Sequence, residues 1–156
     1  MRTHSALPVL VLSVVAGLVG AGPQAIAVSP TVALFSAFSL FGTWSPDCEL
    51  PPSPSNPRAA WHIQGDTVLH TVTFDGHTFA VVDRVGEASL IDADTLTFTV
   101  VRAGSIYATV IIRMENGRLH LIRSVTHDGR VIVDLGRELA TDRDVPSDEP
   151  CSPAMS

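Results

Sequence analysis

Short turn signals recur between residues 59 and 136, and they constrain the fold of this chain more than any other feature. Asp75-Gly76, Asn116-Gly117 and Asp128-Gly129 favour two-residue β-hairpin loops, because Asp, Asn and Gly tolerate the positive φ angles that such loops need. The segments between the turns alternate apolar and polar residues, which is the period of a half-buried strand. The other predicted turns are Gly65-Asp66, Val85-Gly86, Ala93-Asp94 and Ala103-Gly104-Ser105.

These turns divide the region into eight predicted strands. They span residues 59–64, 67–74, 77–84, 87–92, 95–102, 106–114, 118–126 and 130–136. Consecutive hairpins form an antiparallel meander, and eight strands are enough to close one into a barrel. We therefore predict an all-β domain, an eight-stranded antiparallel meander that closes into a small barrel, with residues 42–44 as an additional strand.

Three segments flank the predicted strands. The first is the apolar segment 28–41, where Leu34, Phe35, Phe38 and Phe41 recur at helical spacing and predict a short helix. This helix would either cover the sheet or act as an arm that binds a partner. Residues 49–58 contain several prolines, which cannot donate to a strand ladder, and are predicted to form a surface loop. Residues 141–156 form an acidic tail.

The first 27 residues have the order of a secretory signal peptide. A short polar start with Arg2 precedes the apolar residues 7–22, and Ala25-Ile26-Ala27 supplies a small-x-small cleavage site. An uncleaved anchor is the alternative, since residues 7–27 are long enough to span a bilayer. The cleavage pattern favours removal after Ala27. We therefore expect a single domain over residues 28–156 in the periplasm or secreted, with no stable membrane span after cleavage.

Charge and cysteine content narrow the possible partners and compartment. All ten basic residues are arginine, and loss of Arg2 leaves nine against 16 acidic residues, a net charge of −7. That excess disfavours nucleic acid, whose phosphates require clustered Lys and Arg. Two cysteines in an exported chain predict one disulfide, between Cys48 and Cys151.

The hairpin turns predict which side chains face one another. Across Asp128-Gly129, Arg123 lies opposite Asp134, on a face that is otherwise Met, Ile, Leu and Val. Such a pair on the inner face could orient a polar group of a ligand, or it could be a purely structural ion pair. His70 is also predicted to face inward, opposite Val81, as a core histidine or a ligand contact.

Signatures of metal or catalytic sites are missing from the sequence. The histidines are not spaced like zinc ligands; those in the predicted domain are His62, His70, His77, His120 and His127. The sequence has no Gly-x-Ser-x-Gly elbow, no Cys-x-x-Cys and no phosphate-binding loop. We therefore expect no metal, no cofactor and no catalytic residue, so a hydrolase or isomerase using His70, Arg123 and Asp134 is the weakest of the interpretations.

Gly42-Thr43-Trp44, placed just before a meander of hairpins, resembles the Gly-x-Trp that opens the first strand of lipocalins and their calycin relatives. In that superfamily the tryptophan packs across the closed end of an eight-stranded barrel, and the open end binds apolar ligands. The resemblance implies structural roles for Gly42 and Trp44.

Two further resemblances involve exported proteins. The string Gly42-Thr43-Trp44-Ser45-Pro46-Asp47-Cys48, with Pro54-Ser55-Asn56-Pro57 and a late cysteine, is similar to a group of short exported bacterial proteins of uncharacterised function. In outline the chain also resembles the periplasmic inhibitors of secreted bacterial metalloproteases, which insert an N-terminal arm into the protease.

Together these features favour a non-enzymatic binding module for a small apolar or amphipathic ligand. The alternative is a periplasmic protein that binds an envelope protein or inhibits a protease. The oligomeric state does not follow from the sequence.

Overall fold

The computed structural model describes residues 28–75 and 81–151. The expected signal peptide over residues 1–27, the Gly of the Asp75-Gly76 turn and the start of the strand predicted over 77–84 lie outside the described residues. None of the helices in the described ranges has the length and apolar character needed to cross a bilayer.

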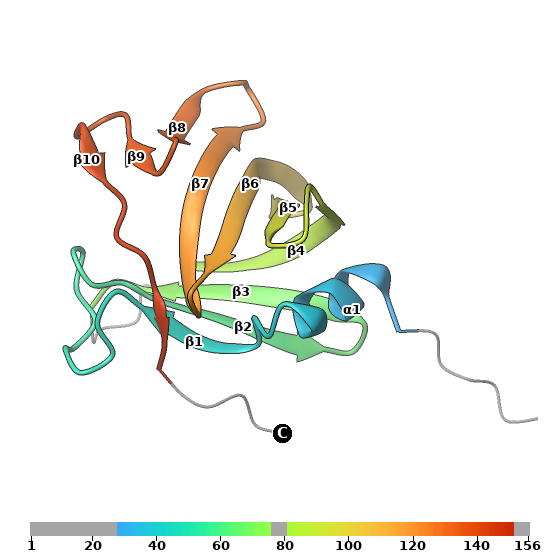
Figure 1. Ribbon diagram of the computed structural model, residues 1–156. Helices are drawn as coiled ribbons and strands as arrows, with labels where there is room; N and C mark the ends of the chain where they lie inside the picture. Colours follow the sequence, from blue (N-terminus) through green and yellow to red (C-terminus); the bar gives the residue numbers. More distant parts are fainter. Residues whose placement is uncertain (1–27, 76–80, 152–156) are drawn as a thin grey trace, which may run out of the picture.

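One helix and eleven antiparallel strands make up the described chain (Figure 1). Their bounds are α1 Pro30–Ala37, β1 Gly42–Ser45, β2 Arg58–Gln64, β3 Thr67–Thr73, β4 Val81–Leu90, β5 Thr95–Arg102, β6 Ser105–Glu115, β7 Arg118–Thr126, β8 Val131–Asp134, β9 Arg137–Glu138, β10 Arg143–Asp144 and β11 Glu149–Pro150. The all-β class and the short N-terminal helix are confirmed.

The strands form one curled sheet that does not close into a barrel, so the predicted closed meander is wrong in that respect. The order is β10-β9-β8-β7-β6-β5-β4-β3-β2-β1-β11, and β10 and β11 are its two edges. Closure fails because β8, β9 and β10 continue the sheet beyond β7. The segment before β11 reaches back only to the start of β7, where Asp148 and Leu119 form a bridge of two 2.9 Å backbone hydrogen bonds.

The predicted count of eight strands is also wrong, and Gly86 gives one reason. Val85-Gly86 is not a turn; it lies inside the continuous strand β4, at an irregularity where the ladder to β5 skips from Val85 to Ala88. A Cβ on Gly86 would lie 2.3 Å from Thr99 Oγ1 of β5. The glycine therefore serves close packing of two strands at a bulge, a role that produces the same sequence signal as a turn.

A tight turn at Leu135-Gly136 gives the second reason. Both residues have positive φ, +50° and +77°, and they connect β8 to β9 as a hairpin in which Asp134 pairs with Arg137. The strand predicted over 130–136 therefore ends at Asp134. The described part of the acidic tail contributes two short strands, β10 and β11.

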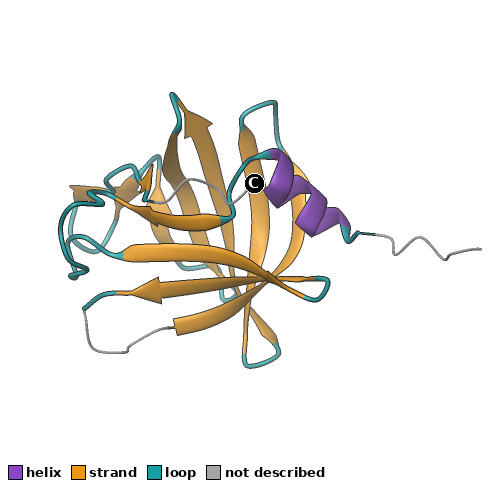
Figure 2. Cartoon of the chain, turned by 90° about the horizontal axis from the view of Figure 1, so that it is seen from below, coloured by secondary structure: helices purple, strands orange, loops and turns teal. Residues whose placement is uncertain are grey.

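Helix α1 packs against β3 and β4, and its Val32 and Phe35 side chains are buried in the core. Figure 2 shows the helix beside the curled sheet. Ser29 caps it by accepting a hydrogen bond from the Val32 amide, and Pro30 occupies a first-turn position that has no use for an amide donor. Phe35 is fully buried, with its ring 6.4 Å from that of Trp61 and 5.4 Å from that of Phe98. Of the two roles expected for this segment, covering the sheet is the one seen.

Trp44 joins the helix to the first strand. It is 4% exposed, its indole Nε1 donates to the Leu40 carbonyl at 2.8 Å, and its ring meets Trp61 edge-on at 6.4 Å. Gly42, two residues earlier, has φ +129°, which disfavours any other residue there. Both residues therefore have structural roles at the junction between the helix and β1.

Replacing Trp44 should measure the strength of this junction. Trp44→Ala is expected to lower the free energy of unfolding by about 3–5 kcal/mol, as large-to-small core changes do. Trp44→Phe keeps most of the packing and loses the hydrogen bond to Leu40, so it should cost less than Trp44→Ala. Urea unfolding of both variants tests this, and an Ala variant as stable as the parent would contradict the junction described here.

Candidate ligand-binding cavity

The concave face of the sheet borders a cavity of about 790 Å³. Strands β2, β3, β5, β6, β7 and β8 all contribute to its wall, and most of the side chains are apolar: Trp61, Val72, Phe98, Val100, Val110, Ile112, Leu119, Leu121, Ile132 and Val133. Trp61 and Phe98 also contact Phe35 of α1. These two rings therefore separate the cavity from the packed core beneath the helix.

Polar side chains enter the lining at a few places. His70 and Ser124 come from β3 and β7, and Ser55 comes from the Pro-rich loop. The segment from β9 to β11 adds Glu138, Arg143, Asp144 and Asp148. The wall is thus apolar along the strands and charged along the C-terminal segment.

His70 is the sequence-predicted site residue that lines the cavity. It pairs with Asp83 rather than with Val81, a shift of two residues that leaves it on the predicted face. Its ring stacks on Trp61 with 5.1 Å between centroids and a 20° interplanar angle. Within the described residues, His70 Nδ1 and Trp61 Nε1 are buried and have no hydrogen-bond partner. Leaving such groups unpaired is costly, about 1–3 kcal/mol each.

Burial lowers the pKa of His70 to about 4, and the Arg102 charge contributes in the same direction while Asp83 opposes it. Asp83 is 4% exposed and accepts two 2.8 Å hydrogen bonds from Arg102, whose guanidinium carbon lies 4.0 Å from the centroid of the Tyr107 ring. The Asp83 carboxylate is thus already paired with Arg102. His70 is therefore neutral at pH 7.

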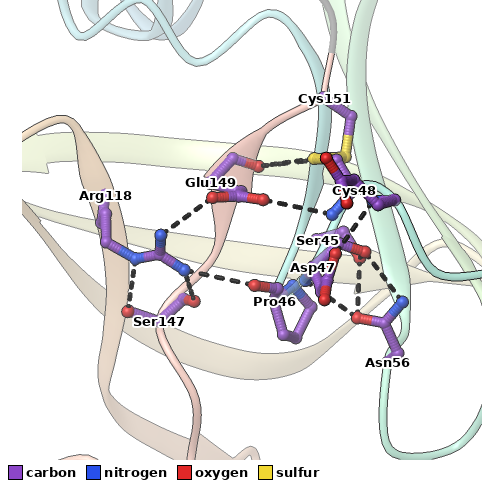
Figure 3. A network of polar contacts seen from close by, with 10 residues as sticks. Ser45, Pro46, Asp47, Cys48, Asn56, Arg118, Ser147, Glu149 and Cys151 are labelled. Atoms are coloured by element: carbon purple, nitrogen blue, oxygen red, sulfur yellow. Dashed lines mark hydrogen bonds and ion pairs between the residues drawn. A yellow bond between two sulfur atoms is a disulfide. The ribbon is translucent and has the colours of Figure 1, made fainter.

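The C-terminal segment is attached to the rest of the sheet by Arg118, the first residue of β7 (Figure 3). Its guanidinium donates to Glu149 Oε2 at 3.0 Å, to the Ser147 hydroxyl and carbonyl at 2.8 and 2.9 Å, and to the Pro46 carbonyl at 3.2 Å. One side chain thus joins β7, the end of β1 and the segment before β11. No motif in the sequence marked Arg118 for this role.

The predicted disulfide between Cys48 and Cys151 is present and completes this attachment. The Cys151 amide donates to Thr43 of β1 at 2.7 Å, and the Cys48 amide donates to Glu149 Oε1 at 3.2 Å. We call the segment from Val145 to Cys151 the C-terminal strap. It is held covalently at one end and by Arg118 along its length, and it borders the cavity through Val145, Pro146 and Asp148.

Asn56 organises the Pro-rich loop that follows Cys48 (Figure 3). Its side-chain oxygen accepts from the Ser45 hydroxyl at 3.1 Å and the Asp47 amide at 3.0 Å, while its nitrogen donates to the Asp47 carbonyl at 2.9 Å. Asn56 is 5% exposed. The polar residues of the motif from Gly42 to Cys48 therefore build this corner together with Asn56, and Pro54 and Pro57 border the cavity.

Asp148 is the residue of the strap whose carboxyl pKa is shifted by its surroundings. Burial raises its pKa to about 6, and the Arg118 charge only partly offsets this. Its backbone is fixed to Leu119 by the bridge, but no described side chain forms an ion pair or hydrogen bond with its carboxylate.

Arg123 and Asp134 form the predicted ion pair, at 3.0 Å, but not on the inner face. The ladder between β6 and β7 shifts by one residue between Ile111 and Ile112, so Arg123 lies opposite Ile111 and Ser124 takes the inward position. A one-residue shift moves a side chain to the other side of a sheet. The two side chains are 46% and 40% exposed, and neither residue lines the cavity.

Within residues 28–75 and 81–151, no three His, Cys, Asp or Glu side chains are arranged to hold a metal ion. The structure does not bring His70 together with Arg123 and Asp134, because His70 faces the cavity and the ion pair lies on the opposite side of the sheet. No family profile, curated protein or solved structure matches this chain.

The exposure of Arg123 and Asp134 predicts weak coupling. In a double-mutant cycle with Arg123→Ala and Asp134→Ala, the interaction energy should be under about 1 kcal/mol, as for other solvent-screened pairs. Urea unfolding of the two single variants and the double variant gives this value. A coupling of several kcal/mol would place the pair in a buried environment instead.

His70 should make the fold less stable in acid. The unfolded chain protonates His70 below pH 6.5, whereas the folded chain does so only near pH 4, so acid favours the unfolded state between these values. The lost stability is at most about 3 kcal/mol. His70→Phe keeps a ring stacked on Trp61 but removes the titrating group. Its free energy of unfolding should therefore decrease less between pH 7 and pH 4 than that of the parent protein. His62→Phe is the control: His62 is exposed, so this variant should show the same dependence of unfolding free energy on pH as the parent protein.

Proposed function

We propose that this protein is an exported, non-enzymatic binding module that holds a small apolar or amphipathic molecule on the concave face of its sheet. The cavity carries the proposal. Its volume of about 790 Å³ lies in the range typical of small-molecule sites, about 300–1,000 Å³, and its wall is mainly apolar with few polar groups. Transfer of an apolar ligand from water into such a wall is favourable by roughly 25 cal/mol per Å² buried.

The support around the cavity favours a preformed site. Helix α1 fills the space beneath Trp61 and Phe98, and the disulfide and Arg118 hold the strap on the other side. A wall that is already in place costs little further ordering when a ligand enters, which favours affinity. This mode of binding is the one that the lipocalin resemblance implies.

The location is part of the proposal. We infer cleavage of residues 1–27 and residence in the periplasm or outside the cell, because a disulfide persists in oxidising compartments. Binding of an envelope protein or inhibition of a protease is the second candidate. An inhibitory arm needs a free N-terminal segment, however, and Val32, Phe35 and Leu40 are part of the core.

A blocking substitution tests the proposal. Val110 of β6 lines the cavity, and the next residue toward the N-terminus, Thr109, is exposed. Val110→Trp should reduce the affinity for a neutral apolar dye such as N-phenyl-1-naphthylamine by about tenfold or more, a loss of at least ~1.4 kcal/mol of binding free energy. Thr109→Trp puts the same ring on the other side of the same strand and should leave the affinity unchanged.

Native mass spectrometry of protein purified from its own compartment would reveal a co-purified molecule. A dye that does not bind to the parent protein, or that binds equally to both tryptophan variants, would refute binding in the cavity.

A further inference from the structure

We propose, as an extension that rests on the proposed function, that the ligand is a cationic amphiphile: its apolar chain lies along the strands, and its protonated amine lies beside Asp148 on the C-terminal strap.

The charge of the lining favours a cation over an anion. Three acidic residues, Glu138, Asp144 and Asp148, border the cavity against one basic residue, Arg143. All four belong to the segment from β9 to β11, so the charge is concentrated on one side of an otherwise apolar wall. A chain with 16 acidic and ten basic residues adds to this potential.

Asp148 is the carboxylate best placed to receive the amine. Two backbone hydrogen bonds to Leu119, at 2.9 Å each, fix its position next to an apolar residue of the wall. Arg118 is the nearby cation, but its guanidinium is occupied by Glu149, Ser147 and Pro46. Asp148 is thus a partly buried carboxylate whose side chain forms no hydrogen bond or ion pair within the described chain. Its raised pKa, about 6, reflects burial without a full counter-charge.

The strands that line the cavity offer no free positive charge to an anionic head group. His70 is neutral at pH 7, and the guanidinium of Arg102 is engaged by Asp83. His70 lines the cavity with one ring nitrogen, Nδ1, buried and unpaired among the described residues, which is a second sign that this wall is not complete without an occupant. A fatty acid would leave its carboxylate facing other carboxylates, whereas an alkylamine would neutralise one of them.

Three probes with the same twelve-carbon chain separate these possibilities: dodecylamine, 1-dodecanol and dodecanoate, each below its aggregation limit. Displacement of N-phenyl-1-naphthylamine at pH 7.5 gives their relative affinities. We expect dodecylamine to bind about tenfold more tightly than dodecanoate, with 1-dodecanol between them.

Asp148→Asn removes the charge and keeps the shape and the backbone bridge. It should weaken dodecylamine binding about tenfold and leave 1-dodecanol unchanged. Glu87→Gln is the matched control, since Glu87 is exposed on β4 and does not line the cavity. Asp144→Asn is a second variant, expected to give a smaller loss in the same direction, and it keeps the test decisive should Asp148→Asn fail to fold.

The outcomes distinguish the two proposals. If the dye binds but dodecanoate competes as well as dodecylamine, or if neither Asp148→Asn nor Asp144→Asn changes the preference, the cationic ligand is wrong and the binding module stands. If neither the dye nor any of the three amphiphiles binds, the proposed function itself is refuted.

Discussion

The attachment of the C-terminal strap to two distant parts of the sheet is the constraint on which the rest of the structure depends. The sheet curls but its ladders do not close, so its shape has to be held from outside the ladders. Cys48–Cys151 joins residues 103 apart in sequence, which by loop entropy contributes about 4–5 kcal/mol. Arg118 connects the same strap to β7. Together with the bridge between Leu119 and Asp148, these two ties hold β7 and the end of β1 to the same strap.

Trp61 divides the interior into two regions with different physical character. On one side lie Phe35 and Trp44, packed against Trp61 at the ring distances of a core. On the other side lies unfilled space bordered by apolar side chains. Empty apolar volume costs stability in proportion to its size. The packing of helix α1 and the disulfide offset that cost, so the fold can retain a cavity that a ligand of the right shape would fill.

How much of this followed from the sequence depended on whether a residue's role is local. Asn116-Gly117 was predictable because both residues adopt positive φ, +52° and +75°, in a two-residue hairpin. The helix, the disulfide and the contact between Arg123 and Asp134 were also predictable. The bulges were not predictable, because they depend on how neighbouring strands pack. At Gly86, for example, Thr99 of another strand leaves no room for a side chain. One such shift was enough to exchange Arg123 for Ser124 at the cavity wall.

The same distinction explains why the most recognisable part of the sequence says least about function. Ser45, Asp47 and Asn56 hydrogen-bond with one another, and Cys48 is bonded to Cys151, so the motif that runs from Gly42 to Cys48 builds a corner of the fold. The candidate site is made of residues that follow no motif, namely His70 within a strand and Asp148 within the strap. Their chemistry comes from burial: the same two side chains in water would be an ordinary imidazole and an ordinary carboxylate. It follows that substitutions at inward strand positions could change which ligand binds, while helix α1, the corner around Asn56 and the C-terminal strap keep their structure.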